Sequence, residues 1–160
     1  MLALKKIAIT GGLASGKTTV GQILQDHGAY VVSADAIVHS LLLENKDIQK
    51  KVISLLGEEV VDSQELNRQK IAKKVFDNLP LLDKLEKILH PQVRVEIKKK
   101  YQEASQAENY SSFIAEIPLL FETDAYNDFD KTIAVIADEN ACIQRFCHNN
   151  HHTKEMFINR

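Results

Sequence analysis

Short apolar runs and longer amphipathic stretches alternate along the chain, and each kind of pattern predicts a different element. The first run, residues 4–10, ends at a pair of glycines and predicts a strand. Similar strand patterns follow at 29–33, 112–117 and 131–137. Between the first two runs, apolar residues recur at helical spacing, and Gly28 stands where that helix would end. The order strand, glycine-rich loop, helix, strand predicts a parallel α/β sheet.

Helical periodicity fills the middle of the chain. Residues 48–56 form one apolar stripe that is closed by Gly57, and a second stretch covers 67–76. A third helix is predicted to start at Pro80, because proline suits the first turn of a helix. That helix should break or kink near Pro91, because an internal proline clashes with the preceding turn.

Two further helices are predicted near the end of the chain, from Asn140 to about Cys147 and from Thr153. Together these patterns predict one unit whose parallel-sheet core covers about 1–34 and 110–138. A helical insertion of about 35–109 interrupts this core.

The composition is that of an ordinary globular protein. Hydrophobic residues make up 44% of the 160 positions and charged residues 26%, and the formal net charge is −2. Neither nucleic acid nor an anionic membrane is therefore expected as a partner. No stretch approaches the ~18 apolar residues of a membrane-spanning helix, and Lys5 and Lys6 interrupt the apolar run that a signal peptide needs. Two cysteines, Cys142 and Cys147, are too few for a disulfide framework, so a cytoplasmic protein is expected.

Charge is distributed unevenly along the chain. Residues 46–100 carry 13 basic and 9 acidic groups, a net charge of +4, whereas residues 101–160 have a net charge of −6. Two interpretations of the basic segment stay open. It attracts an anionic substrate, or it consists of ordinary solvated helix faces.

A complete phosphate-binding motif, G-x-x-x-x-G-K-[ST], lies between the first predicted strand and the first predicted helix. Its residues, with the threonine that follows, are Gly11, Gly12, Leu13, Ala14, Ser15, Gly16, Lys17, Thr18 and Thr19. Glycines let backbone N–H groups approach phosphate oxygens, and the helix N-terminus adds partial positive charge. Lys17 supplies a full charge, and the Thr18 hydroxyl is suited to ligate Mg²⁺. The motif predicts binding of ATP or a similar triphosphate.

The class of P-loop protein follows from what accompanies the loop. A regulatory GTPase would need D-x-x-G and N-K-x-D, and neither is present. A small-molecule kinase fits better, because Asp35 follows the second predicted strand, which is expected to lie close to the loop. Asp35 is therefore a candidate general base for the acceptor hydroxyl. The alternative is that Asp35 only caps a helix that starts at Ala36.

Glu116 ends the third predicted strand, where an acidic residue usually supports Mg²⁺ in P-loop proteins. We expect Glu116 to act with Thr18 at the metal. A purely structural role for Glu116 at the strand end is the alternative.

Four motifs in order along the chain resemble the dephospho-CoA kinase family. They are residues 9–19 (Ile-Thr-Gly-Gly-Leu-Ala-Ser-Gly-Lys-Thr-Thr), Ala34-Asp35, Leu89-His90-Pro91 and 117–122 (Ile-Pro-Leu-Leu-Phe-Glu). The resemblance extends from residue 4 to about 155. It implies a P-loop kinase fold, a three-layer α/β/α parallel sheet with a helical substrate-binding insertion and a lid.

The resemblance also implies a reaction, in which ATP with Mg²⁺ phosphorylates the ribose 3′-hydroxyl of dephospho-CoA to give coenzyme A. Asp35 would then be the general base and Lys17 the phosphate clamp. His90, Arg94 and Glu122 would lie near the acceptor. The lysine-rich insertion would bind the CoA moiety, which agrees with its positive charge.

In the family resemblance, residues 139–160 correspond to the lid, whose arginines stabilise charge on the transferring phosphoryl group. Arg145 is the candidate in this chain. The family usually has a second arginine shortly afterwards, but here none follows before Arg160, so either a histidine replaces it or the lid is weaker. Ser33 and Glu116 also stand where many members of the family have Asp.

A group of cysteines and histidines in the lid invites a metal-site interpretation: Cys142, Cys147, His148, His151 and His152. Their spacing does not match the paired ligands of a compact zinc site. A solvated helix with incidental histidines is therefore the favoured interpretation.

Two other functions stay open from the sequence. The chain is either a P-loop kinase for another nucleoside or small metabolite, or a nucleotide-binding relative without catalytic activity. Compared with the family that it resembles, it is also several dozen residues short. We therefore expect it to be part of a longer protein that holds the end of the lid, a fifth strand and the base-binding loop.

Overall fold

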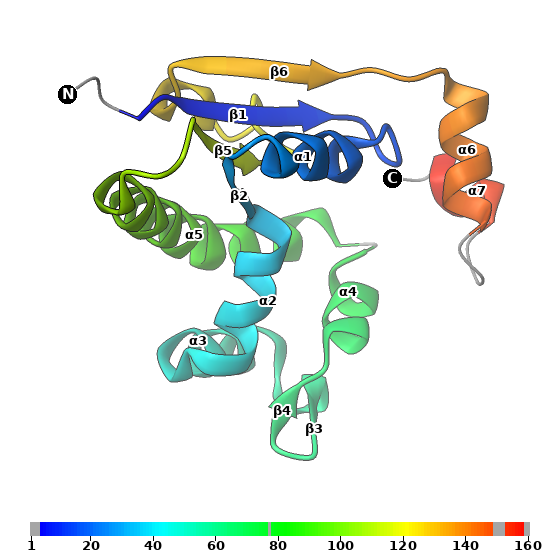
Figure 1. Ribbon diagram of the computed structural model, residues 1–160. Helices are drawn as coiled ribbons and strands as arrows, with labels where there is room; N and C mark the ends of the chain where they lie inside the picture. The colour runs from blue at the N-terminus through cyan, green and yellow to red at the C-terminus, as the bar shows by residue number, and fades with distance from the viewer. Residues whose placement is uncertain (1–3, 77, 149–152, 159–160) are drawn as a thin grey trace. The chain divides into compact units, whose positions relative to one another are not determined.

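The computed structural model describes residues 4–76, 78–148 and 153–158 and forms two compact units (Figure 1). The first, here called the sheet unit, comprises residues 1–34 and 100–160. The second, the helical unit, comprises residues 35–99.

Four strands form the sheet, in the order β2-β5-β1-β6: β1 (Lys6–Gly11), β2 (Tyr30–Ser33), β5 (Phe113–Glu116) and β6 (Lys131–Val135). All neighbouring pairs are parallel. The register places Glu116 opposite both Ile9 and Ser33, and Val135 opposite Gly11. The carboxyl ends of the strands therefore lie at one edge of the sheet, where ligands bind in parallel α/β sheets. The four strands predicted from the sequence are confirmed.

Helix α1 (Lys17–Asp26) covers one face of the sheet. Its Val20 and Leu24 pack against three buried residues, Ile9 and Ile114 of the sheet and Ala29 just before β2. The helix ends as predicted at Gly28, which has a φ of +86° and donates its N–H to the carbonyl of Gln25 at 2.9 Å. This left-handed conformation favours glycine, and the following N–H groups satisfy the last carbonyls of the helix.

The opposite face of the sheet carries aromatic residues and the C-terminal end of α5 (Leu79–Ala107). Phe113 points away from α1, because side chains alternate along a strand and Ile114 faces α1. Its ring stacks on Tyr30 with 5.8 Å between centroids and meets Tyr101 of α5 edge-on at 5.4 Å. The hydroxyl of Tyr101 donates to the carbonyl of Leu4 at 2.9 Å. Helices on both faces give the three-layer α/β/α arrangement that was predicted.

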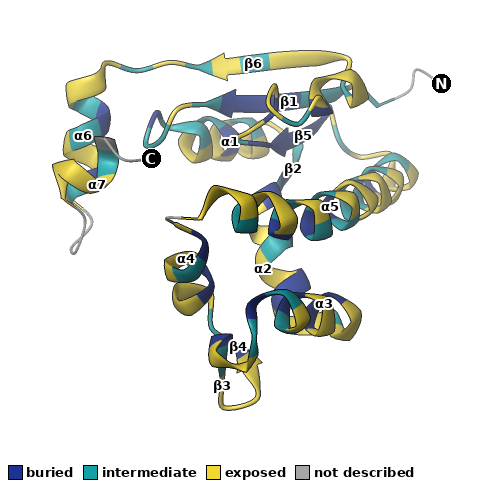
Figure 2. Cartoon of the chain, turned by 180° about the vertical axis from the view of Figure 1, so that it is seen from behind, coloured by how far each residue is buried: buried dark blue, intermediate teal, exposed yellow. Residues whose placement is uncertain are grey.

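The edge strand β6 lies next to β1 and is largely exposed, whereas β1 and β5 are mostly buried (Figure 2). The 3₁₀ helix η2 (Ala125–Asp128) precedes β6, and α6 (Glu139–His148) and α7 (Lys154–Ile158) follow it. Phe146 of α6 meets Phe157 of α7 edge-on, with centroids 5.8 Å apart. Both helices that the sequence predicts here are confirmed.

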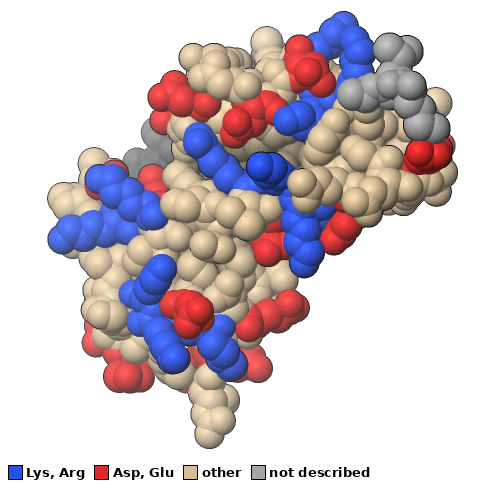
Figure 3. All heavy atoms as spheres, turned by 90° about the vertical axis from the view of Figure 1, so that its left-hand side faces the viewer, with Lys and Arg blue, Asp and Glu red and all other residues tan. Residues whose placement is uncertain are grey.

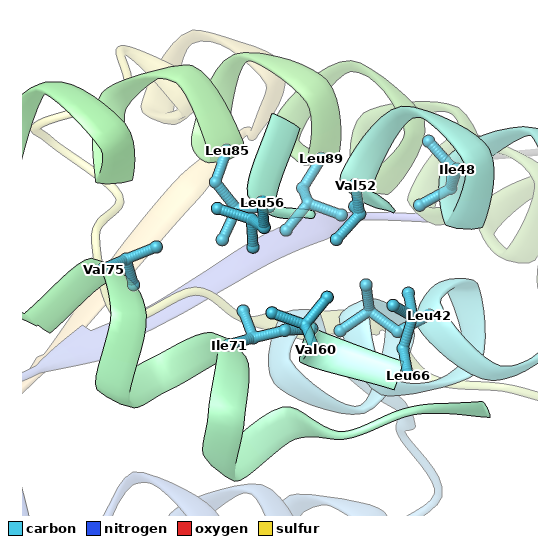
Figure 4. Packing of buried hydrophobic residues seen from close by; sticks show 10 residues of the cluster. All are labelled: Leu42, Ile48, Val52, Leu56, Val60, Leu66, Ile71, Val75, Leu85 and Leu89. Atoms are coloured by element: carbon cyan, nitrogen blue, oxygen red, sulfur yellow. The ribbon is translucent and has the colours of Figure 1, made fainter. Parts of the chain in front are cut away.

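The helical unit is built from most of α2 (Ala34–Glu44), α3 (Lys46–Leu56), η1 (Glu58–Val60), β3 (Val61–Asp62), β4 (Glu65–Leu66), α4 (Arg68–Phe76) and the first part of α5. These elements enclose ten buried aliphatic residues (Figure 4): Leu42, Ile48, Val52, Leu56, Val60, Leu66, Ile71, Val75, Leu85 and Leu89. Asparagine side chains cap three of its helices by accepting backbone N–H groups: Asn45 for α3, Asn67 for α4 and Asn78 for α5. The predicted helices at 48–56 and 67–76 are confirmed, and α3 ends at Gly57 as expected.

Most basic residues of the helical unit are exposed, and several pair with acidic neighbours. Lys70 lies 3.0 Å from Asp62, and its hydrogen bond, together with one from Asn67, lowers the pKa of the Asp62 carboxyl. Lys74 pairs with Glu59. Basic and acidic side chains are also interspersed over the face drawn in Figure 3. Part of the positive charge of residues 46–100 is thus compensated locally.

Two features of the helical unit differ from the sequence predictions. Of the break or kink expected near Pro91, the break is wrong, because α5 continues as one helix from Leu79 to Ala107, while a kink stays a prediction. Proline removes only one donor, and Leu89 and Val93 are buried on either side of it, so that packing stabilises the helix across the missing bond.

The hairpin β3–β4 was not predicted, because Ser63 and Gln64 make its turn with positive φ in place of glycine or asparagine.

Among the described residues, none of the helices combines the length and hydrophobicity that crossing a membrane requires.

Candidate active site

The phosphate-binding motif forms the loop between β1 and α1, and two of its glycines are required by its geometry. Gly11 has a φ of +149°, and a Cβ atom there would lie 2.3 Å from the carbonyl oxygen of Val135 in β6. Gly16 has a φ of +104° and is the N-cap of α1. Any other residue at Gly11 would collide with backbone that cannot move aside, because β1 and β6 are paired there.

The N-terminus of α1 faces into this loop. Gly16 contributes no side chain that caps the helix, so the first-turn N–H groups are left for a ligand. Thr18 and Thr19 are exposed in that first turn. The partial positive charge of a helix N-terminus and free N–H groups together favour a phosphate.

Lys17 lies across the loop. Its Nζ donates to the carbonyl oxygens of Gly11 at 2.9 Å and of Gly12 at 2.8 Å. Ser15 is buried within the loop, and its hydroxyl has no hydrogen-bond partner among the residues described. A buried hydroxyl without a protein partner fits a loop that takes its remaining contacts from ligand oxygens.

Arg145 of α6 brings a second cation to the loop. Its Nη1 lies 3.4 Å from the carbonyl oxygens of both Ala14 and Ser15. Helix α6 is fixed at its start by Asp138, whose Oδ1 accepts the N–H of Ala141 at 3.1 Å. The structure thus brings Lys17 and Arg145, which are 128 residues apart in the sequence, to the same loop.

Glu116 ends β5 on the face of the sheet that α1 covers. It is buried, and a Cβ atom at Gly21 of α1 would lie 2.6 Å from its Oε1. Gly21 thus leaves space for the carboxylate under the helix that carries Thr18. A hydroxyl and a carboxylate are the hard oxygen ligands that Mg²⁺ prefers, so this donor set fits the ion. No cluster of three His, Cys, Asp or Glu residues suited to a metal occurs in the described ranges, and a P-loop Mg²⁺ site does not need one, because phosphates and water complete it.

Glu122 lies on the turn that follows β5 and is exposed. This turn is tied to β1, because the hydroxyl of Thr10 donates to the carbonyl of Pro118 at 3.0 Å. The predicted acceptor-side residue and the phosphate loop therefore both belong to the sheet unit, at the carboxyl edge of the sheet.

The remaining predicted site residues lie in the helical unit. Asp35 is the second residue of α2, which begins at Ala34, so the alternative of a cap before Ala36 is wrong. The strand before it, β2, is separated from β1 by β5 and is not the neighbour of the loop strand. His90 and Arg94 are one turn apart on α5 and therefore share a face of that helix. The roles of these three residues stay predictions.

Several residues that shape the site were missed in the sequence. The sequence does not show that Gly21 makes room for Glu116, although a glycine inside a helical pattern indicates that the helix packs closely against something at that point. The bond from Thr10 to Pro118 joins residues with no local pattern in common. In the cysteine–histidine group, Cys142 is buried and Cys147 half-buried, while His151 and His152 lie outside the described residues.

Comparison with known proteins gives consistent matches. The family model for dephospho-CoA kinase matches residues 5–160. A dephospho-CoA kinase of Protochlamydia amoebophila is 45% identical over 161 residues, which cover 100% of this chain and 79% of that protein. One of Chlamydia caviae is 49% identical over 146 residues, which cover 91% of this chain and 72% of that protein.

Two solved structures share the fold. TT1252 from Thermus thermophilus superposes with a TM-score of 0.82 at 28% identity, covering 99% of this chain and 79% of that one. A dephospho-CoA kinase from Campylobacter jejuni gives a TM-score of 0.60 at 24% identity, covering 96% of this chain and 76% of that one.

Proposed function

The chain belongs to the dephospho-CoA kinase family, and we propose that it transfers the γ-phosphoryl group of ATP to the ribose 3′-hydroxyl of dephospho-CoA, giving coenzyme A and ADP. The observation that carries this proposal is a complete phosphate loop with Lys17 and Arg145 directed at it, in a chain that the family model matches over residues 5–160.

On the nucleotide side, the loop amides and the start of α1 bind the β- and γ-phosphates. Lys17 exchanges its bonds with the Gly11 and Gly12 carbonyls for phosphate oxygens and neutralises their charge. Arg145 lies close enough to the loop to stabilise charge that develops on the phosphoryl group as it transfers. Thr18 and Glu116 would hold Mg²⁺, which would offset the negative charge of the phosphates.

On the acceptor side, Asp35 is the general base. It takes the proton of the 3′-hydroxyl as that oxygen forms a bond to the γ-phosphorus, while the bond from phosphorus to the ADP oxygen breaks. His90, Arg94 and Glu122 position the acceptor. The exposed lysines of the helical unit favour binding of a substrate with a pyrophosphate group.

An acceptor panel tests this function. ADP release in the presence of ATP and Mg²⁺ is measured with dephospho-CoA, adenosine, uridine and shikimate in turn. The proposal expects stimulation by dephospho-CoA above all others. Stimulation by a different acceptor alone would assign the site to another metabolite kinase, and tight ATP binding without transfer to any acceptor would indicate a nucleotide-binding relative.

A further inference from the structure

We propose that Thr10 is a positioning residue that couples the phosphate loop to the turn carrying Glu122, through the hydrogen bond from its hydroxyl to the carbonyl of Pro118. The inference rests on the proposed function, because Glu122 is assigned there to the acceptor. Thr10 itself touches neither substrate, and it acts by holding the turn in a fixed position relative to the loop.

The bond is partly buried and long-range. Thr10 is only 5% exposed, and its Oγ1 lies 3.0 Å from the carbonyl oxygen of Pro118, 108 residues away in the sequence. Thr10 directly precedes Gly11, which pairs with Val135 of β6 at the start of the loop. Pairing of β1 with β6 holds the loop end of this bond in place, so that the turn after Pro118 is the end that depends on it.

The bond replaces backbone pairing where that pairing stops. The ladder between β1 and β5 extends to the N–H of Ile117, which donates to the carbonyl of Ile9 at 2.8 Å. Proline has no N–H, so the carbonyl is the one backbone group through which Pro118 can be tied to a neighbour. The hydroxyl of Thr10 makes that connection from the adjacent strand.

Hydrogen bonds within the segment that begins at Pro118 hold its residues together. A contact that holds Pro118 in place therefore also positions the rest of the segment. The Thr123 hydroxyl donates to the carbonyl of Leu119 at 2.8 Å, and the N–H of Ala125 donates to that of Leu120 at 3.1 Å. Leu120 is fully buried, and its packing in the core holds the segment against the sheet unit. Glu122 is exposed on this compact turn, so its position relative to the loop depends on how the turn is held.

The test compares Thr10→Val, which keeps the shape of the side chain but loses the hydroxyl, with Thr10→Ser, which keeps the hydroxyl. Thr10→Val should raise the KM for dephospho-CoA about tenfold, the effect of one lost hydrogen bond of ordinary strength, and leave the Kd for ATP within about twofold. Thr10→Ser should behave like the unmodified protein. Thr132→Val, at an exposed position of the edge strand β6, controls for the loss of a threonine hydroxyl as such.

A second readout does not depend on activity. Hydrogen–deuterium exchange of the peptide covering 118–126 should become faster in Thr10→Val and stay unchanged in Thr10→Ser. Equal exchange and equal KM in the two variants would overturn the proposal, as would a loss of ATP affinity as large as that of dephospho-CoA. If the unmodified protein does not phosphorylate dephospho-CoA, the proposed function fails, and the exchange measurement still decides whether Thr10 holds the turn.

Discussion

The carboxylate of Glu116 lies under the backbone of Gly21, so close that a Cβ atom at position 21 would stand 2.6 Å from its Oε1. A glycine in the interior of a helix costs about 1 kcal/mol relative to alanine. The helix that begins at the phosphate loop therefore carries a destabilising residue at the point where it passes over a buried acid. The geometry explains why glycine occurs here, because a larger residue at position 21 would occupy the space of the Glu116 carboxylate.

We predict that Gly21→Ala displaces the Glu116 carboxylate and weakens the Mg²⁺ site. The Mg²⁺ concentration for half-maximal activity should rise about tenfold, the typical effect of disturbing groups that orient metal ligands. The double variant Gly21→Ala with Glu116→Asp should recover part of this loss, because the shorter acid needs less room. Gln22→Ala, on the exposed side of the same helix, is the control, and an unchanged Mg²⁺ requirement in Gly21→Ala would refute the metal role of Glu116.

Lys17→Ala should weaken ATP binding about tenfold to a hundredfold, because hydrogen bonds to a charged group contribute about 1.5–3 kcal/mol. Its bonds to the Gly11 and Gly12 carbonyls place the ammonium directly over the loop. Titration with a fluorescent ATP analogue measures the effect. Lys131→Ala, at an exposed position of β6, should leave the affinity unchanged, and equal losses in the two variants would mean that only net charge matters.

Asp35→Asn should lower kcat by about 10²–10⁴, because it removes the base but keeps the size of the side chain. The Kd for ATP should stay within about twofold. Asp47→Asn provides a matched control, since Asp47 is also an exposed acid in the first turn of a helix of the same unit. If Asp35→Asn turns over as fast as Asp47→Asn, then Asp35 is not the general base.

Arg145→Gln should lower kcat about a hundredfold, the usual effect of removing one donor that stabilises transition-state charge. Arg145→Lys should lose less, because it keeps the positive charge and loses only the planar fork of N–H donors. Steady-state kinetics at saturating ATP separate this effect from nucleotide binding. A variant that changes only the KM for ATP would assign Arg145 to ground-state binding.

The core of the helical unit supports a stability prediction. Leu56 is 1% exposed within the cluster of Figure 4, so Leu56→Ala should reduce the free energy of unfolding by about 2–5 kcal/mol. Leu79→Ala, at a position 74% exposed, should change it by less than about 0.5 kcal/mol. Urea denaturation followed by circular dichroism measures both, and equal effects would contradict the burial of Leu56.

Local patterns in the sequence were enough for much of this fold. The phosphate loop, the end of α1 at Gly28 and the end of α3 at Gly57 follow from glycines, because the positive φ that each place requires suits few other residue types. The four strands follow from short apolar runs between such signals. The hairpin after η1 escaped prediction, because Ser63 and Gln64 adopt positive φ without the usual residues.

Relations between distant residues were not accessible in the same way. The order β2-β5-β1-β6 depends on how all four strands assemble. The sequence of the second strand does not show that β5 lies between it and β1. The contact of Gly21 with Glu116 and the bond from Thr10 to Pro118 arise only once β1, β5 and α1 are packed. The candidate catalytic and binding residues could be recognised one by one in the sequence, whereas the residues that position them could not.

Phosphorus NMR of the product formed from ATP and dephospho-CoA tests the central claim most directly. We predict a new phosphomonoester resonance coupled to the ribose 3′ proton, together with one equivalent of ADP. Release of inorganic phosphate without a new monoester, or a monoester coupled to any other ribose position, would contradict it.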